Sequence, residues 1–275
     1  MRGLFVFVCF TVLFCNNSYG QYGQGTPSIV TPNPTVLDSV GIDQKMGDTV
    51  PLDLLFQDES GQSIRLGAFF KDKPVILVPA YYECPMLCTQ VLNGLLMGLR
   101  PLSLTAGVDF ELVTFSIDPN EGAELAAAKK IVYNEGYGRN SDGWRFLTGD
   151  FQSIKTLTDA IGFHFAHDPE TDEYIHASGI MIVTPQGKLA RYLFGVEFAP
   201  RDIKLGLLEA SEEKIGTPID TIFLYCFQYN PLTGKYSLAI YRLVRIAGGL
   251  TVLGLIAMIV VFGRKYKQRV LHQSV

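Results

Sequence analysis

The chain has 275 residues, of which 48% are hydrophobic and 18% are charged, and its formal net charge at pH 7 is −4. Soluble domains carry about a quarter charged residues, so part of this chain is more apolar than a soluble globule requires. The composition excludes a disordered or collagen-like chain, and 5 cysteines in 275 residues exclude a small disulfide-stabilised scaffold. Polar and apolar stretches alternate over most of the length, which excludes a polytopic transporter.

The first 20 residues are predicted to form a secretory signal peptide. Arg2 provides a positive start, residues 4–15 form an apolar run, and small residues precede a cleavage site after Gly20. These 12 apolar residues would rise about 18 Å as a helix, which is too short for a hydrocarbon core of about 30 Å. The alternatives are an uncleaved anchor and a lipoprotein signal ending at Cys15, against which the bulky preceding phenylalanine argues.

The middle of the chain is predicted to be one α/β domain. Residues 21–44 are polar at first and rich in Gly and Pro, as expected of a linker or an ordered lead-in arm. Residues 45–214 follow as the domain, with an apolar run at 74–80 that is typical of a strand buried on both faces. The other expected elements are short strands around a turn at 58–61, a helix at 89–99, a strand at 110–117, a helix at 121–134, a strand at 144–147, a helix at 150–161, a hairpin at 177–194 and a helix at 201–214. Strands that alternate with helices and end in a hairpin and a helix indicate a thioredoxin-like sheet.

The C-terminal part is predicted to anchor the domain in a membrane. Residues 215–245 form a juxtamembrane segment with a hairpin that turns at Asn-Pro and Thr-Gly. Residues 246–263 are uncharged and lie between two arginines, and this 18-residue helix would reach about 27 Å. With the arginines extended to the interface, the helix spans a bilayer once; a buried core helix is the alternative.

The distribution of charge places the main domain outside the cytoplasm. Residues 264–275 carry four basic side chains in the sequence RKYKQR, so the positive-inside rule makes this tail cytoplasmic. We therefore expect a single-pass protein of the cell membrane with its domain on the extracytoplasmic, periplasmic side. Without Arg2 and those four residues, 18 of the 23 basic residues remain against all 27 acidic ones, a charge of about −9 that excludes a nucleic-acid-binding surface.

Two cysteines stand where the buried strand meets the next helix. Signal-peptide cleavage leaves three cysteines, and Cys84 and Cys88 form the motif Cys-Pro-Met-Leu-Cys. A spacing of four puts both sulfurs on one helix face, and a helix N-terminus favours the thiolate that binds metal or attacks a disulfide. A structural disulfide is the alternative, although a bridge across so short a loop constrains little.

A third ligand would distinguish a metal site from a redox pair. His272 lies in the tail, and His164 and His167 lie in a polar segment beyond a helix end. His176 precedes the hairpin strand that packs beside the cysteine-bearing loop in a thioredoxin-type sheet. Two thiolates and an imidazole suit Cu(I) and can also hold Cu(II). His176 is therefore the predicted third ligand; the alternative is a core histidine whose nitrogens are satisfied by hydrogen bonds.

These motifs resemble the Sco/SenC family of copper-binding proteins involved in cytochrome c oxidase assembly. The resemblance covers residues 45–214 and is carried by Cys-Pro-Met-Leu-Cys after a buried strand, Phe-Ser-Ile-Asp-Pro at 115–119, Trp-Arg-Phe-Leu-Thr-Gly at 144–149, and the histidine before the hairpin. It implies that Cys84, Cys88 and His176 bind one copper ion. It further implies that the protein delivers copper to, or reduces the cysteines of, the binuclear copper site of oxidase subunit II. A copper donor protein or a thiol reductant is then a further partner.

Two features depart from the family pattern. Familiar members are anchored near the N-terminus, whereas this chain is expected to be anchored at its C-terminus. Tyr81-Tyr82-Glu83 also replaces a Phe-Thr type of sequence before the first cysteine, and Glu83 either disfavours the thiolate or faces solvent.

Three questions stay open at the level of sequence. Cys84 and Cys88 could instead act as a thiol–disulfide oxidoreductase on other exported proteins, although their spacing is wider than Cys-x-x-Cys. A peroxidase is the weaker alternative, because Pro79 is suitably placed but no threonine stands three positions before Cys84. Cys226 lies outside the shared domain and is an extra copper ligand, a mixed-disulfide point or a packing residue.

Overall fold

The computed structural model describes residues 39–83, 87–139, 143–169, 172–211, 227–238 and 240–273. The predicted signal peptide and most of the lead-in arm lie outside these residues, as do Cys84 and Cys226. The domain limits expected from the sequence therefore remain predictions.

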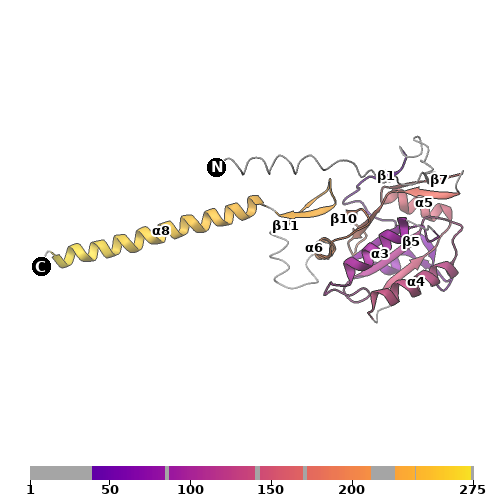
Figure 1. Ribbon diagram of the computed structural model, residues 1–275, viewed down its shortest axis with the longest axis horizontal. Helices are drawn as coiled ribbons and strands as arrows, with labels where there is room; N and C mark the ends of the chain where they lie inside the picture. The colour runs from indigo at the N-terminus through magenta and orange to yellow at the C-terminus, as the bar shows by residue number, and fades with distance from the viewer. Residues whose placement is uncertain are drawn as a thin grey trace, which may run out of the picture. The chain divides into compact units, whose positions relative to one another are not determined.

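The described domain is organised around a five-stranded sheet with the strand order β10-β9-β4-β5-β6 (Figure 1). Its members are β4 (Val75–Ala80), β5 (Glu111–Ser116), β6 (Trp144–Leu147), β9 (Gly179–Val183) and β10 (Leu189–Phe194). Strands β4, β5 and β6 run parallel, whereas β9 pairs antiparallel with both β4 and β10. All six residues of the central strand β4 are buried, which confirms the prediction of a strand covered on both faces.

Helices cover both faces of this sheet. They are α3 (Leu87–Leu99), α4 (Ala123–Tyr137), α5 (Phe151–Ala160), α6 (Pro200–Ala210) and the short 3-10 helix η1 (Leu66–Phe69). Ile76 and Val78 of β4 pack in the cluster that includes α3, α4 and α6. Val75 and Leu77 point to the opposite face and pack in the cluster that includes α5 and η1. This alternation confirms the predicted mixed α/β fold of the thioredoxin type.

Local interactions set the helix ends. The Asp150 carboxylate accepts the amide proton of Ser153 at 2.9 Å, so Asp150 is the N-cap and α5 begins one residue after it. Gly138 has a φ of 68°, a left-handed conformation that ends α4 after Tyr137, beyond the predicted end at residue 134. The start of α4 at Ala123 also falls later than predicted, since Glu121 makes contacts of another kind, described below.

The polar segment around His164 and His167 differs from the expectation of a connection after a helix. It forms β7 (Phe163–Asp168) and β8 (Glu173–His176), which pair in a small sheet of order β1-β7-β8 with β1 (Gly41–Ile42). Phe163 is buried and Phe165 packs against the same cluster, so the segment alternates apolar and polar residues with the period of a strand. The histidines between them conceal this pattern in the sequence.

A second hairpin follows the domain. It consists of β11 (Phe227–Asn230) and β12 (Lys235–Leu238), joined by a turn that confirms the predicted Asn-Pro and Thr-Gly turn. The Tyr229 hydroxyl donates to the carbonyl of Tyr192 on β10 at 2.5 Å, and the Tyr236 hydroxyl donates to Glu209 of α6. The hairpin is thereby bound to the domain through two phenols, the partly buried one of Tyr229 and the buried one of Tyr236.

One helix among the described residues is long and apolar enough to cross a membrane. This is α8 (Ile240–Gln273). Its apolar segment Val244–Phe262 has 19 residues, and none of it is buried against the rest of the protein. The predicted span at 246–263 lies inside this helix. Residue 239 alone separates the helix from β12.

The turn between β2 (Leu55–Gln57) and β3 (Ser63–Arg65) is held by a charged cluster. Glu59 pairs with Lys130 of α4 and lies 2.9 Å from the guanidinium of Arg145 on β6. Its side chain is only 10% exposed. Burial opposes ionisation, but the hydrogen bonds from Lys130 and Arg145 outweigh it and lower the pKa of Glu59. The ionised carboxylate therefore joins the edge hairpin to α4 and β6.

We predict that Glu59→Gln destabilises the full chain by about 1–3 kcal/mol at neutral pH, because two partly buried cations lose their partner. The lowered folded-state pKa means that this stabilisation is present at neutral pH and disappears as the pH falls through that pKa. Urea unfolding, followed by the fluorescence of the single tryptophan, Trp144, measures the difference. A difference between variant and wild type that does not shrink in acid would contradict this account.

Candidate metal centre

Strand β4 carries the chain to the cysteine motif. Tyr81 and Tyr82 follow the strand and are buried. Cys84 lies outside the described residues, whereas Cys88 lies in the first turn of α3, although its side chain is not described. The prediction that the second cysteine lies at a helix start is therefore confirmed. At this position the unpaired amides and dipole of the helix favour a thiolate.

His176 lies at the end of the central sheet from which β4 leads to the cysteine motif. It is the last residue of β8, and two residues separate it from β9. Since Leu77 pairs with Met181 and Val75 with Val183, the start of β9 lies toward the end of β4 that leads to the cysteines. The structure thus places His176 toward the end of the sheet from which β4 leads to the cysteine motif. Coordination by Cys84, Cys88 and His176 together remains a prediction.

The surroundings of His176 fix its ring. The residue is 9% exposed, and its ring packs 5.9 Å from that of Phe163. Nδ1 lies 2.8 Å from the carbonyl oxygen of Ala177. A carbonyl only accepts, so Nδ1 carries the proton and the lone pair of the neutral imidazole belongs to Nε2. Metal-binding histidines are oriented in this way, by a hydrogen bond from the nitrogen that does not bind the metal.

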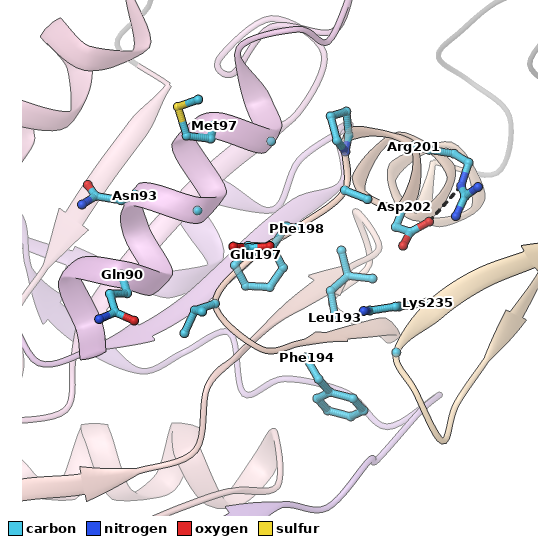
Figure 2. A pocket seen from close by; sticks show the side chains of 16 residues that line it. Gln90, Asn93, Met97, Leu193, Phe194, Glu197, Phe198, Arg201, Asp202 and Lys235 are labelled. Carbon is cyan, nitrogen blue, oxygen red and sulfur yellow. Dashed lines mark hydrogen bonds and ion pairs between the residues drawn. The ribbon is translucent and has the colours of Figure 1, made fainter. Parts of the chain in front are cut away.

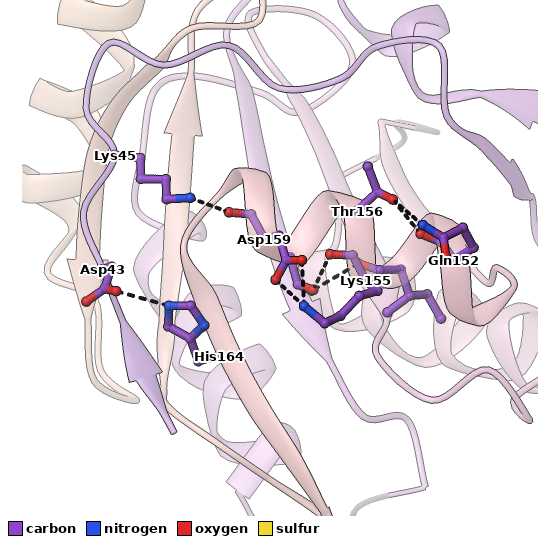
Figure 3. Close-up of polar contacts among 9 residues, drawn as sticks. Asp43, Lys45, Gln152, Lys155, Thr156, Asp159 and His164 are labelled. Carbon is purple, nitrogen blue, oxygen red and sulfur yellow. Dashed lines mark hydrogen bonds and ion pairs between the residues drawn. The ribbon is translucent and has the colours of Figure 1, made fainter. Parts of the chain in front are cut away.

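The other histidines have different environments. His164 Nε2 lies 3.1 Å from Asp43, and His167 Nε2 lies 2.9 Å from Asp172. Figure 3 shows the first of these pairs beside the polar contacts of α5. Both imidazoles are at least 40% exposed. The side chain of His272 is not described. Of the histidines with described side chains, His176 alone is buried.

A buried carboxylate lies directly under the approach to the cysteines. Glu121 is 7% exposed and accepts the amide protons of Tyr82 at 3.0 Å and Glu83 at 2.7 Å. It also accepts the hydroxyl proton of Ser116, at the end of β5. Burial raises the pKa of Glu121 in spite of these hydrogen bonds. The sequence offers no signal for this role, because the two amide donors lie 39 and 38 positions earlier in the chain and are backbone groups.

Two tyrosines connect the cysteine approach to the histidine strand. The rings of Tyr81 and Tyr174 meet edge to face at 5.6 Å. Burial, together with the nearby carboxylates of Asp118, Glu121 and others, raises the pKa of Tyr81 to about 12, so the phenol stays protonated. Glu83 is exposed and faces solvent, which settles one of the alternatives from the sequence. The negative charge gathered here favours a cation at this edge.

The donor set fits copper by its chemistry. Within the described part of the chain, no three His, Cys, Asp or Glu side chains come close enough to hold a metal ion. Two of the three predicted donors are the thiols of Cys84 and Cys88, whose side chains are not among those described. Two soft thiolates and a neutral imidazole match the preference of Cu(I), and the oriented ring of His176 fits that use.

A groove elsewhere on the described surface is a separate feature. It has a volume of about 700 Å³ and is lined by α3, the loop after β10, the start of α6 and the second hairpin (Figure 2). Gln90, Met97 and Phe198 are among its lining residues, and His176 is not. The groove is therefore not the predicted copper site.

Comparison with known proteins gives a consistent result. The family model SCO1/SenC matches residues 50–205. A curated relative, the SCO1 protein homolog of Bacillus subtilis (strain 168), is 28% identical over 149 residues, which cover 54% of this chain and 75% of the relative. Two crystal structures of Aquifex aeolicus VF5 proteins, provisionally assigned to electron transfer and electron transport, are also similar. The first has 27% identity and a TM-score of 0.55 over 62% of this chain and 96% of its own. The second has 28% identity and a TM-score of 0.52 over 60% and 98%.

The matched region contains the central strand β4, both cysteines of the motif and His176. It spans more than half of the chain. The chain therefore belongs to the SCO1/SenC family.

Proposed function

We propose that this protein is a membrane-anchored copper-binding factor for cytochrome c oxidase assembly, and that Cys84, Cys88 and His176 bind the metal. The observation that carries the proposal is the placement of an oriented, buried His176 at the sheet end where β4 leads to the cysteine motif. Membership of the SCO1/SenC family supports it, as does the relative named an SCO1 protein homolog.

Three soft ligands make copper transfer possible at low cost. Cu(I) held by two thiolates and the Nε2 of His176 is coordinatively unsaturated, so a partner thiolate can add before one of these ligands leaves. No electron moves in this exchange, and the proton of each incoming thiol passes to the thiolate that is released. We infer that the acceptor is the binuclear copper site of oxidase subunit II, and that a copper donor protein loads the domain.

The same two cysteines could instead prepare that site. Oxidation of the Cys84 and Cys88 thiols to a disulfide releases two electrons and two protons, which convert a disulfide of the partner into two thiols. A separate thiol reductant would then restore the pair. Copper delivery and thiol reduction are the two forms of the proposal.

We further propose that the domain is held on the outer side of the cell membrane. Residues 1–20 would direct export, 21–44 would lead into the domain at 45–214, and the segment 215–245 would join it to the span at 246–263. The apolar window of α8 supports the anchor by its length and composition. The basic tail at 264–275 would stay in the cytoplasm.

A thiol–disulfide oxidoreductase acting on other exported proteins is the second candidate. The observation in its favour is that Cys88 lies in the first described turn of α3. Redox pairs lie at such positions because the helix stabilises the attacking thiolate.

Titration of the reduced full chain in detergent tests the copper site. We predict that wild type binds one Cu(I), and that Cys84→Ser or His176→Ala weakens binding by more than the roughly 10–100-fold typical of losing an outer hydrogen bond. His164→Ala is the matched control, because that histidine is exposed and paired with Asp43. Competition with a chromophoric Cu(I) chelator measures the affinities. Unchanged affinity and stoichiometry in His176→Ala would show that the site is wrong.

The reduction potential of the cysteine pair separates the two candidates. In a Cys226→Ser background, we predict a potential below about −300 mV and slow exchange with protein disulfides, since the pair is then suited to metal binding and not to turnover. Equilibration of the full chain with dithiol buffers measures it. A potential between about −200 and −120 mV with rapid exchange would favour the oxidoreductase.

A further inference from the structure

We propose that Glu121 and Tyr174 are positioning residues that hold the two halves of the metal centre together through the residues that follow β4. Glu121 fixes the approach to Cys84 and Cys88, and Tyr174 fixes the strand that carries His176. This inference rests on the proposed function and adds to it the groups that set the spacing between the cysteines and the histidine.

Glu121 binds the cysteine half through backbone amides. Its Oε2 accepts from the amide of Tyr82 at 3.0 Å and its Oε1 accepts from the amide of Glu83 at 2.7 Å, so both oxygens are used. The acceptor is 7% exposed, and the residue that follows Glu83 is the first cysteine. Fixing two consecutive amides fixes the direction in which the chain leaves for Cys84.

The chemistry of this contact requires a carboxylate. The two amides and the Ser116 hydroxyl are neutral donors, and each needs a lone pair on Glu121. A glutamine of the same shape offers one accepting oxygen, while its amide nitrogen can only donate. A buried amide proton would then face a donor, which costs about 1–3 kcal/mol. The burial of a carboxylate among neutral donors is thus explained by its role in fixing the two backbone amides.

Tyr174 binds the histidine half. It stands two residues before His176, on the same face of β8. Its ring meets Tyr81, which leads into the cysteine motif, at 5.6 Å and 68°. The strand of His176 is thereby attached to the cysteine approach by a ring contact.

Glu121 is itself attached to the central sheet. It accepts the hydroxyl proton of Ser116, the last residue of β5, and β5 pairs with β4. The cysteines and the histidine are far apart in sequence. Because Glu121 holds the amides of Tyr82 and Glu83 and the ring of Tyr174 meets Tyr81, the three residues after β4 give both halves a common reference.

The test uses the full chain in detergent, reduced and loaded with Cu(I), in wild-type, Glu121→Gln, Tyr174→Leu and double-variant forms. We expect each single substitution to weaken Cu(I) binding about 10-fold, the lower end of the range for groups that orient metal ligands. With Cu(II), we expect a shifted thiolate-to-copper charge-transfer absorption in both, since the angle between the ligands changes. Stability alone would not move that band.

Two matched controls make the same changes elsewhere. Glu59→Gln alters a buried carboxylate that pairs with Lys130 and Arg145, and Tyr137→Leu removes the ring of a tyrosine in the core cluster on the other face of the sheet. We expect both to keep wild-type copper affinity and absorption. Trp144 fluorescence shows whether each variant is folded. If Glu121→Gln does not fold, Tyr174→Leu, which removes a ring that is only partly buried, decides the proposal.

Wild-type binding and spectra in Glu121→Gln or in Tyr174→Leu would overturn the proposal and leave the proposed function intact. Equal losses in the two controls would overturn it as well, because the effect would then follow stability. Failure of the wild-type chain to bind Cu(I) would instead remove the proposed function, and the positioning role with it.

Discussion

Burial of β4 on both faces is the constraint on which the rest of this structure depends. Every residue of the strand is covered, by α3, α4 and α6 on one side and by α5 and η1 on the other. An apolar strand with its ladder hydrogen bonds to β5 and β9 has one stable position in the sheet. The chain that leaves β4 therefore emerges at a fixed point, beside the start of β9 and the end of β5.

Function follows from what is gathered at that point. Three residues separate β4 from the cysteine motif, Cys88 lies in α3, and His176 approaches from β8 with its proton held on Nδ1. The buried amides of Tyr82 and Glu83 need an acceptor, and Glu121 provides it. The apolar sheet thus places the ligands roughly, and a few buried polar contacts hold the surrounding chain in place.

Most of the sheet could be predicted because its signals are local. The apolar run of β4, the helical spacing of α3 and the hairpin of β9 and β10 each lie within a short window, and His176 was accessible from the order of these elements. The β7–β8 hairpin was missed because histidines alternate with Phe163 and Phe165 and make the strand look polar. Glu121 and Tyr174 could not be found, since their partners come from other elements and are backbone amides or buried rings. Such contacts exist only once the chain has folded.

X-ray absorption spectroscopy at the copper edge tests the central claim most directly. The measurement uses the Cu(I)-loaded full chain in a Cys226→Ser background, compared with the same chain carrying His176→Ala. We predict two sulfur neighbours and one imidazole nitrogen for the parent, and loss of the imidazole scattering with both sulfurs retained in the variant. A copper surrounded by sulfur alone in the parent, or an imidazole signal that persists without His176, would contradict the account.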